Sequence, residues 1–406
     1  MEEWKEYRLG DFMEFNPKIK LAKDTLARKI TMDQLIPHCR DIHSWTYEPY
    51  SGGAKFENGD TIMARITPCL ENGKHAYISC LEKDEVAYGS TEYIVIRGRK
   101  GISDNAFVYY LSHYPIFKNA AIKSMVGTSG RQRAQVDVLE NMTMALPSLP
   151  EQKKIASIFS SLDDKIEVNR RINNNLEQQA QALFKSWFVD FEPFKDQPFV
   201  ESELGMIPPG WKISTLGELV KVIDNRGKTP PLSTNKEYPI IDVKVLSGKE
   251  RILNYDNSSK FVSQETYNIW FRNGHPQKYD ILLSTVGSLA EMKIFMGGNG
   301  CIAQNVVALR NPQISLYLFD YLRMIKSDLI AYNIGSVQPS IKVTHIIKHK
   351  ILIPDDKIIR AYINKTQIIT EIIYNNLVEI ERLALIRDSL LPRLMSGELS
   401  VNDVKE

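Results

Sequence analysis

The chain has 406 residues, of which 43% are hydrophobic and 25% charged, and its formal net charge is +2. This length exceeds one ordinary hydrophobic core and predicts about two globular domains, while the composition excludes a largely disordered chain. No apolar run reaches the roughly 18 residues that span a bilayer, and residues 1–6 lack the pattern of a signal peptide. We therefore expect a cytoplasmic protein without a membrane partner.

Charge and cysteine usage are only weakly informative. Lys and Arg balance Asp and Glu over residues 1–150 but exceed them over residues 193–354, which alone would not indicate nucleic acid. The cysteines form no CxxC pair and have no metal-ligand spacing, so we expect reduced, mostly buried thiols and no metal site. They are Cys39, Cys69, Cys80 and Cys301.

The most informative feature is an internal repeat. Residues 4–11 (WKEYRLGD) are matched by residues 211–218 (WKISTLGE) at Trp, Lys, Leu, Gly and the final acid. Further pairs follow in the same order: residues 59–64 with 279–284, 93–97 with 306–310, 127–133 with 335–340, and Pro147 with Pro354. Several matched pairs in one order indicate a tandem duplication.

A long helical pattern follows each copy. The repeat predicts a first domain over residues 1–150, a helix over 151–192, a second domain over 193–354 that begins with a linker at 193–210, and a second helix and tail over 355–406. Short β-branched segments inside each copy are typical of strands. The predicted fold class is therefore α+β, with two tandem domains separated by two long helices.

Apolar residues recur on both helices at alternating spacings of three and four, which is the seam of a coiled coil. The seam comprises Ile155, Phe159, Leu162, Ile166, Asn169, Asn173, Leu176, Ala180, Leu183 and Trp187, and then Tyr362, Thr366, Ile369, Ile373, Asn376, Ile380, Leu383 and Leu390. The similar cadence favours pairing of the two helices, and the seam asparagines can fix its register. The alternative is that each helix packs only on its neighbouring domain.

The helix length has a consequence for the expected architecture. A helix of some 38 residues is roughly 55 Å long. If the helices are antiparallel, the duplication places one domain at each end, related by a pseudo-two-fold axis. Such a body suits a DNA site whose two segments lie more than one helical turn apart.

Three short motifs carry a resemblance to a known family. Residues 203–211 (ELGMIPPGW), 149–155 (LPEQKKI) and 127–129 (GTS) resemble segments of the specificity subunits of type I restriction–modification enzymes. Residues 338–340 (QPS) and 130–133 (GRQR) are similar to two variants of a further family segment. The resemblance covers the whole chain as an order of parts.

This resemblance implies a function. Each domain would be a target-recognition domain that reads one half of a split sequence in double-stranded DNA, and the helices would form an antiparallel coiled coil. The partners would be two methyltransferase subunits, which bind S-adenosylmethionine and methylate adenine N6, and separate restriction or motor subunits. The chain itself would hold neither a catalytic residue nor a cofactor.

Candidate DNA contacts are basic, amide and hydroxyl side chains in predicted loops. The leading candidates occupy equivalent stretches of the two copies: Arg131, Gln132 and Arg133 in the first, and Gln338, Ser340 and Lys342 in the second. Weaker candidates are Lys55, Arg65, Lys74, Arg226, Lys228 and Lys244. For each of them the alternative is a solvated surface charge.

Two other classes of function remain as alternatives: an enzyme acting alone, either a DNA methyltransferase or a nuclease, and a coiled-coil scaffold without a DNA role. Residues 226–229 (RGKT) lack the upstream glycine of a phosphate-binding loop, and the glycines of 295–300 fit a turn better than a cofactor loop. Residues 291–293 (EMK) lack the acidic partner of a nuclease metal site. The sequence has no HExxH and no Asn-or-Asp-Pro-Pro-aromatic motif.

Overall fold

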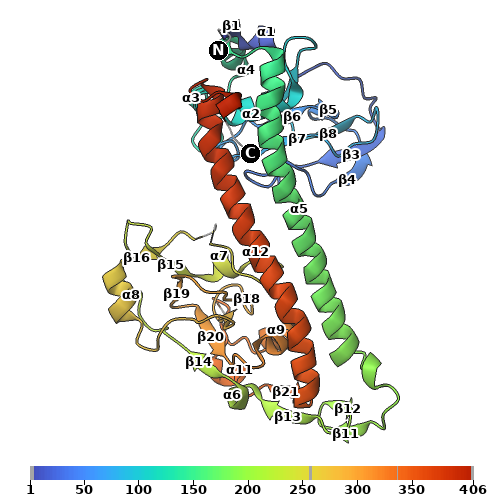
Figure 1. Ribbon diagram of the computed structural model, residues 1–406, viewed down its shortest axis with the longest axis vertical. Helices are drawn as coiled ribbons and strands as arrows, with labels where there is room; N and C mark the ends of the chain where they lie inside the picture. The colour runs from blue at the N-terminus through green and yellow to red at the C-terminus, as the bar shows by residue number, and fades with distance from the viewer. Residues whose placement is uncertain (1–3, 256–257, 336, 404–406) are drawn as a thin grey trace. The chain divides into compact units, whose positions relative to one another are not determined.

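A computed structural model describes residues 4–255, 258–335 and 337–403 of the chain (Figure 1). It divides into two compact units: unit 1 comprises Met1–Val168 and Glu379–Glu406, and unit 2 comprises Asn169–Val378. Ser336, which belongs to the fourth repeat pair, lies outside the described residues. Within them, no helix is long and apolar enough to cross a membrane.

Unit 1 contains two four-stranded sheets and one two-stranded sheet. Their orders are β2-β9-β6-β7, β4-β3-β8-β5 and β1-β10. The elements are β1 (Lys5–Arg8), α1 (Leu9–Phe12), β2 (Met13–Phe15), β3 (Leu26–Ile30), β4 (Thr46–Pro49), β5 (Lys55–Phe56), β6 (Thr61–Ala64), β7 (His75–Tyr77), β8 (Ala87–Gly89), β9 (Tyr93–Gly98), α2 (Asn105–His113), α3 (Pro115–Lys123), α4 (Val136–Asn141) and β10 (Thr143–Leu146).

Unit 2 has a similar arrangement with β14-β20-β17-β18, β16-β15-β19 and β13-β21, in which the second sheet has three strands instead of four, and it adds a hairpin of β11 and β12. Its elements are the 3-10 helix η1 (Glu192–Phe194), β11 (Val200–Ser202), β12 (Gly205–Ile207), β13 (Lys212–Thr215), α6 (Leu216–Leu219), β14 (Lys221–Ile223), β15 (Tyr238–Ile241), α7 (Val243–Leu246), β16 (Phe261–Val262), α8 (Gln264–Trp270), β17 (Ile281–Ser284), β18 (Met292–Ile294), β19 (Cys301–Ile302), β20 (Val306–Arg310), α9 (Ser315–Met324), α10 (Lys326–Ala331), α11 (Val343–Ile346) and β21 (Lys350–Ile353).

The repeated Leu-Gly-acid motif forms the same one-turn helix in both units. Leu9 and Leu216 are fully buried at its start. A Cβ atom on Gly10 would lie 3.2 Å from the Glu140 carbonyl oxygen, and one on Gly217 would lie 3.1 Å from that of Ile347. A larger residue would have to push the neighbouring backbone away by a few tenths of an ångström, so the close approach favours glycine in both copies.

The repeated Asp and Arg residues form one ion pair in each unit. The Arg97 guanidinium lies 2.6 Å from Asp60, and the Arg310 guanidinium lies 2.7 Å from Asp280. Both carboxylates are almost completely buried and also accept a backbone N–H, from Glu57 and Gln277 respectively. The partner strands have the same register, since Thr61 opposes Ile96 in unit 1 and Ile281 opposes Leu309 in unit 2.

Two helices of 40 residues each, α5 (Leu149–Phe188) and α12 (Asp356–Met395), contribute to both units (Figure 1). In unit 1, Asp163 of α5 contacts Arg387 of α12 at 2.7 Å. In unit 2, the Asn376 side chain donates a 2.8 Å hydrogen bond to that of Asn173. The Trp187 and Tyr362 rings follow with centroids 6.1 Å apart. Residues further along α5 thus contact residues progressively earlier in α12, so the two helices are antiparallel.

The predicted seam positions are all buried or half-buried. Helix pairing and packing on the domains occur together, so the two alternatives drawn from the sequence do not exclude one another. Phe159 packs on Tyr110 of α2 at 5.1 Å between ring centroids, and Phe184 packs on Tyr317 of α9 at 5.9 Å. For this reason each unit includes half of each helix instead of ending where the helices begin.

The helix ends differ slightly from the predicted bounds. Helix α5 begins at Leu149 and stops at Phe188, before the predicted end at residue 192. Phe191 has a left-handed backbone with φ of 53°, which a continuing helix cannot accommodate. The phenylalanines of this segment pack on Trp211 of the repeat motif: Phe188, Phe191 and Phe194 all have ring centroids within 5.9 Å of it.

Candidate nucleic-acid interface

In unit 1 the backbone brings residues 131–133 to the end of strand β6. The Thr67 N–H donates to the Gln132 carbonyl at 3.0 Å, and the Ala134 N–H donates to the Arg65 carbonyl at 2.8 Å. Arg65, a weaker sequence candidate, therefore lies beside the leading stretch. Arg131 is exposed, and the side chains of Gln132 and Arg133 are half-buried.

Unit 2 repeats these hydrogen bonds. The Gly287 N–H donates to the Pro339 carbonyl at 2.9 Å, and the Ile341 N–H donates to the Thr285 carbonyl at 2.8 Å. Ser340 thus occupies the position of Arg133, and Gln338 that of Arg131. Gln338 and Lys342 are exposed, while Ser340 is half-buried.

Two arginines near these strand ends are held by carboxylates. Arg133 contacts Glu92 through Nε and Nη2, the shortest distance being 2.6 Å, and these hydrogen bonds raise the pKa of Arg133. Arg226 contacts Asp224 in the same two-point manner, and its Nη1 donates to Thr285 Oγ1 at 3.1 Å. Burial acts to raise the pKa of Asp224, but hydrogen bonds from Arg226 keep it below its usual value. Both guanidinium groups are thereby fixed in orientation.

The remaining basic candidates fall into different surroundings. Lys74 donates to the Met32 carbonyl at 2.7 Å, so its ammonium group is engaged within unit 1. Lys55 lies on the edge strand β5 with its Nζ 5.6 Å from the Tyr50 ring centroid. Lys228 and Lys244 of unit 2 are exposed.

A cleft of about 290 Å³ opens beside these residues in unit 2. Its lining includes Lys244, the loop at residues 286–288 that contacts Pro339, and Thr229, which follows Lys228. Other polar residues at this cleft are Asp242, Lys260, Gln304 and Asn305, none of which is a candidate from the sequence. No motif marks them, because loops distant in sequence assemble the cleft.

The residues considered for nuclease chemistry have structural partners. Glu291 contacts Lys326 at 2.8 Å, and the buried Lys293 contacts Glu250 at 3.2 Å. Burial lowers the pKa of Lys293. Across residues 4–255, 258–335 and 337–403, no group of three or more His, Cys, Asp or Glu side chains could hold a metal ion.

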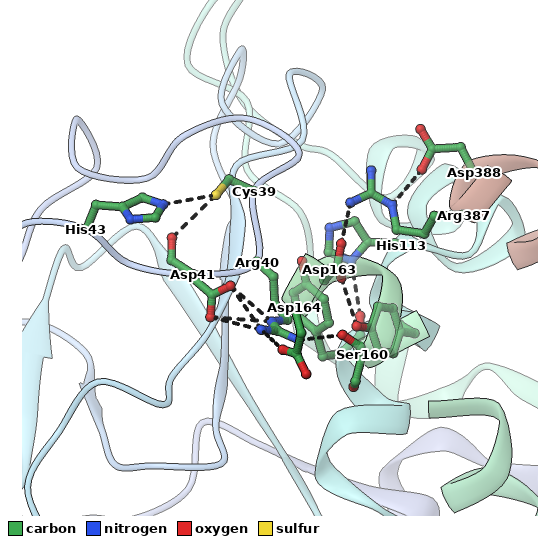
Figure 2. Close-up of polar contacts among 12 residues, drawn as sticks. Cys39, Arg40, Asp41, His43, His113, Ser160, Asp163, Asp164, Arg387 and Asp388 are labelled. Carbon is green, nitrogen blue, oxygen red and sulfur yellow. Dashed lines mark hydrogen bonds and ion pairs between the residues drawn. The ribbon is translucent and has the colours of Figure 1, made fainter. Parts of the chain in front are cut away.

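Polar contacts fix a loop of unit 1 to its helices, and sequence reasoning missed them. In Figure 2, Arg40 of the β3–β4 loop lies between Asp41 and Asp164, and it also reaches the Ser160 carbonyl of α5. These acids raise the pKa of Arg40 although burial opposes the charge. Arg387 of α12 contacts Asp163 and Asp388 in the same view.

Unit 2 has a deeper counterpart of this contact. The fully buried Arg251 lies 2.8 Å from Glu177 of α5 and 3.2 Å from Asp320 of α9. It also donates to Thr370 of α12 at 3.3 Å. In each unit, therefore, an arginine from a loop next to the second sheet contacts a carboxylate of α5: Arg40 contacts Asp164, and Arg251 contacts Glu177.

Two tandem α+β domains with matching loops at matching strand ends, each attached to an antiparallel helix pair, define a duplicated recognition protein. The sequence matches the family described as "Type I restriction modification DNA specificity domain" over residues 1–178 and 208–382. The chain belongs to this family.

Individual relatives agree with the family match. The chain is 30% identical over 308 residues to the type I restriction enzyme MjaIX specificity subunit of Methanocaldococcus jannaschii, covering 73% of this chain and 70% of that protein. It is 27% identical to the HindI specificity subunit of Haemophilus influenzae, covering 98% of this chain and 100% of the relative. The crystal structure of a type I S subunit from M. genitalium has the same fold, with a TM-score of 0.56, 14% identity and coverage of 97% and 96%.

Proposed function

We propose that this chain is the subunit of a type I restriction–modification complex that recognises a two-part sequence in double-stranded DNA and positions two methyltransferase subunits for adenine N6 methylation. The observation that carries the proposal is the family match to both units, residues 1–178 and 208–382. A duplicated reader suits a target in two parts, with one unit for each part.

The local chemistry of both units supports DNA as the ligand. Arg133 and Arg226 are oriented by carboxylates at equivalent strand ends, and Lys228 and Lys244 are exposed nearby in unit 2. Such groups bind phosphates and base edges. We further propose that the chain carries no catalytic residue, and that S-adenosylmethionine is bound by the methyltransferase subunits. Restriction or motor subunits would complete the complex.

The test is to co-express the chain with its methyltransferase subunit and sequence the methylated genomic DNA. The expected result is N6-methyladenine at a two-part motif with a fixed gap. Replacing residues 1–150 by another recognition domain should change one half of that motif only. A continuous motif, or no motif although the complex assembles, would refute the proposal.

A further inference from the structure

The cleft of unit 2 is built from four segments that are far apart in the sequence. They are the loop at residues 229–232, the start of α7 at residues 242–244, the loop at residues 286–288 and the turn at residues 303–305. A Cβ atom added to Gly287 would meet nothing within 4 Å, so the cleft is open above this residue. Its polar lining includes two amides, a carboxylate and two ammonium groups.

Gln304 has an unusual backbone conformation in this cleft. Its φ is +57°, in the left-handed region that residues other than glycine rarely adopt. Two backbone hydrogen bonds of 2.7 Å hold the turn, from the Asn305 N–H to the Ala303 carbonyl and from the Thr285 N–H to the Asn305 carbonyl. The exposed Gln304 amide also donates to Thr229 Oγ1. Strain of this kind is common at binding sites, where it places a side chain in advance.

Unit 1 has different side chains at the equivalent positions. The parallel pair β3–β8 aligns Ile30 with Gly89, as β15–β19 aligns Ile241 with Ile302. Counting onward from these pairs, unit 1 has Thr31, Asp33 and Thr91 where unit 2 has Asp242, Lys244 and Gln304. Unit 1 therefore has the acid Asp33 where unit 2 has the base Lys244, and the hydroxyl of Thr91 where unit 2 has the amide of Gln304.

Some buried residues of each domain are the same in the two copies. Leu35 and Leu246 are buried at matching places, and Arg97 and Arg310 form the same ion pair. The two units therefore differ in chemistry at a cleft position while sharing the frame around it. Two domains that read different sequences require this combination, because the shared buried residues set how each domain lies on the DNA. The side chains that line the cleft then set which base is preferred.

We propose that this cleft receives base edges in the major groove of the DNA and determines the half-sequence read by unit 2. Gln304 reads an adenine through N6 and N7, and Lys244 reads a guanine through O6 and N7, which are the pairings that an amide and an ammonium group favour. Arg226 and Lys228, next to Thr229 of the cleft, contact phosphates. This inference rests on the proposed function.

The experiment uses the assembled complex with its methyltransferase subunits, and the readout is the methylated motif. The half of the motif that belongs to unit 2 is the one that persists when residues 1–150 are exchanged. Gln304→Gly removes the side chain and also relieves the left-handed backbone, so the fold should be retained. We expect discrimination at one A·T position of that half to fall by roughly tenfold to a hundredfold, with the other half unchanged.

Further variants separate base reading from general effects. Gln304→Asn tolerates the left-handed backbone but shortens the side chain, and should relax the same position. Lys244→Ala should relax a neighbouring G·C position. The matched controls Gln313→Ala and Lys348→Ala alter exposed residues that do not line the cleft, and should leave the motif intact.

The outcomes separate this inference from the function on which it rests. A two-part wild-type motif that both Gln304 variants leave unchanged would overturn the cleft assignment alone. Uniform loss of methylation at all sites with an unaltered melting temperature would also overturn it, because the residue would then bind without discriminating bases. A wild-type complex that methylates no two-part motif would instead refute the proposed function.

Discussion

The two units share the buried ion pair and the strand register of their sheets, and they differ in the polar side chains that follow the strand ends. Asp60 with Arg97 and Asp280 with Arg310 are the same buried ion pair, formed between strands of the same register. One step beyond these strands, unit 1 has Arg133 held by Glu92, whereas Ser340 occupies the position of Arg133 in unit 2. Duplication therefore preserved what folding requires and left the polar surface free to diverge.

The attachment of each unit to α5 shows a second difference. Arg251 of unit 2 is fully buried between Glu177 and Asp320, but Arg40 of unit 1 is partly exposed, and one of its two partners, Asp164, has a side chain that is 65% exposed. A charge removed from water needs its partners far more than an exposed pair does. The same type of contact should therefore contribute very differently to the stability of the two units.

The largest expected effect is that of Arg251→Ala. Removing this guanidinium leaves the buried Asp320 without a cation and Glu177 with Arg323 alone, which should lower the free energy of unfolding by about 3–5 kcal/mol. Arg40→Ala, the matched variant in unit 1, should cost less, about 1–3 kcal/mol, because water can solvate Asp164 although the mostly buried Asp41 loses its cation. Urea unfolding of both variants measures the difference. Equal losses would show that burial does not distinguish the two contacts.

Acid should affect unit 1 through two buried histidines, His75 and His113, whose rings meet edge to face with centroids 4.6 Å apart. Burial lowers the pKa of His113 to about 4 and also lowers that of His75. The unfolded chain takes up protons below about pH 6.5 while the folded state resists them, so stability falls as the pH drops from 6.5 toward 4. For His113 alone the loss by pH 5 is about 2 kcal/mol.

The measurement is chemical unfolding of the wild type and of His113→Phe between pH 7 and pH 5. The variant cannot gain this proton, so its stability should depend less steeply on pH. His275→Phe in unit 2 is the control, because burial lowers the pKa of this half-buried histidine by a less extreme amount. If the wild type and His113→Phe lost stability in parallel, other groups would be responsible for the pH dependence.

The sequence predicted the features that depend on repetition and period. The duplicated Leu-Gly-acid motif, the strands around residues 61–64 and 281–284, and both long helices follow from patterns that one chain displays by itself. The family assignment followed from short motifs at the helix junctions and is confirmed by the match to both units. These features are local in the chain or periodic, and their physical signal is therefore present in the sequence.

The cleft and the contacts to α5 could not be predicted in this way. Gln304 and Thr229 are 75 residues apart and meet only because loops converge after folding. From the sequence alone, Arg251 would be assigned to the surface. Its burial depends on Glu177 and Asp320, which are distant in the chain. Lys74 was one of the weaker candidates for a DNA contact, and its hydrogen bond to the Met32 carbonyl has no signal in the sequence. Tertiary packing, which one sequence does not display, decides each of these cases.

The smallest expected effect compares the two halves of the helix pair. In unit 1 the seam begins with the apolar Ile155 and Phe159, whereas in unit 2 it contains Asn173 and Asn376, joined by a hydrogen bond of 2.8 Å. Replacing both asparagines by leucine should raise the free energy of unfolding by about 1 kcal/mol, since apolar side chains pack better at a seam than a polar pair does.

The single variant Asn376→Leu should instead lower stability by about 1 kcal/mol, because the half-buried Asn173 oxygen loses its donor. A double-mutant cycle in urea therefore predicts opposite signs for the single and double changes. Additive effects of one sign would mean that the two amides do not act as a pair. The asparagines would then not fix the register of α5 against α12 in unit 2, and packing of the aromatic residues Phe184, Trp187 and Tyr362 would have to set it.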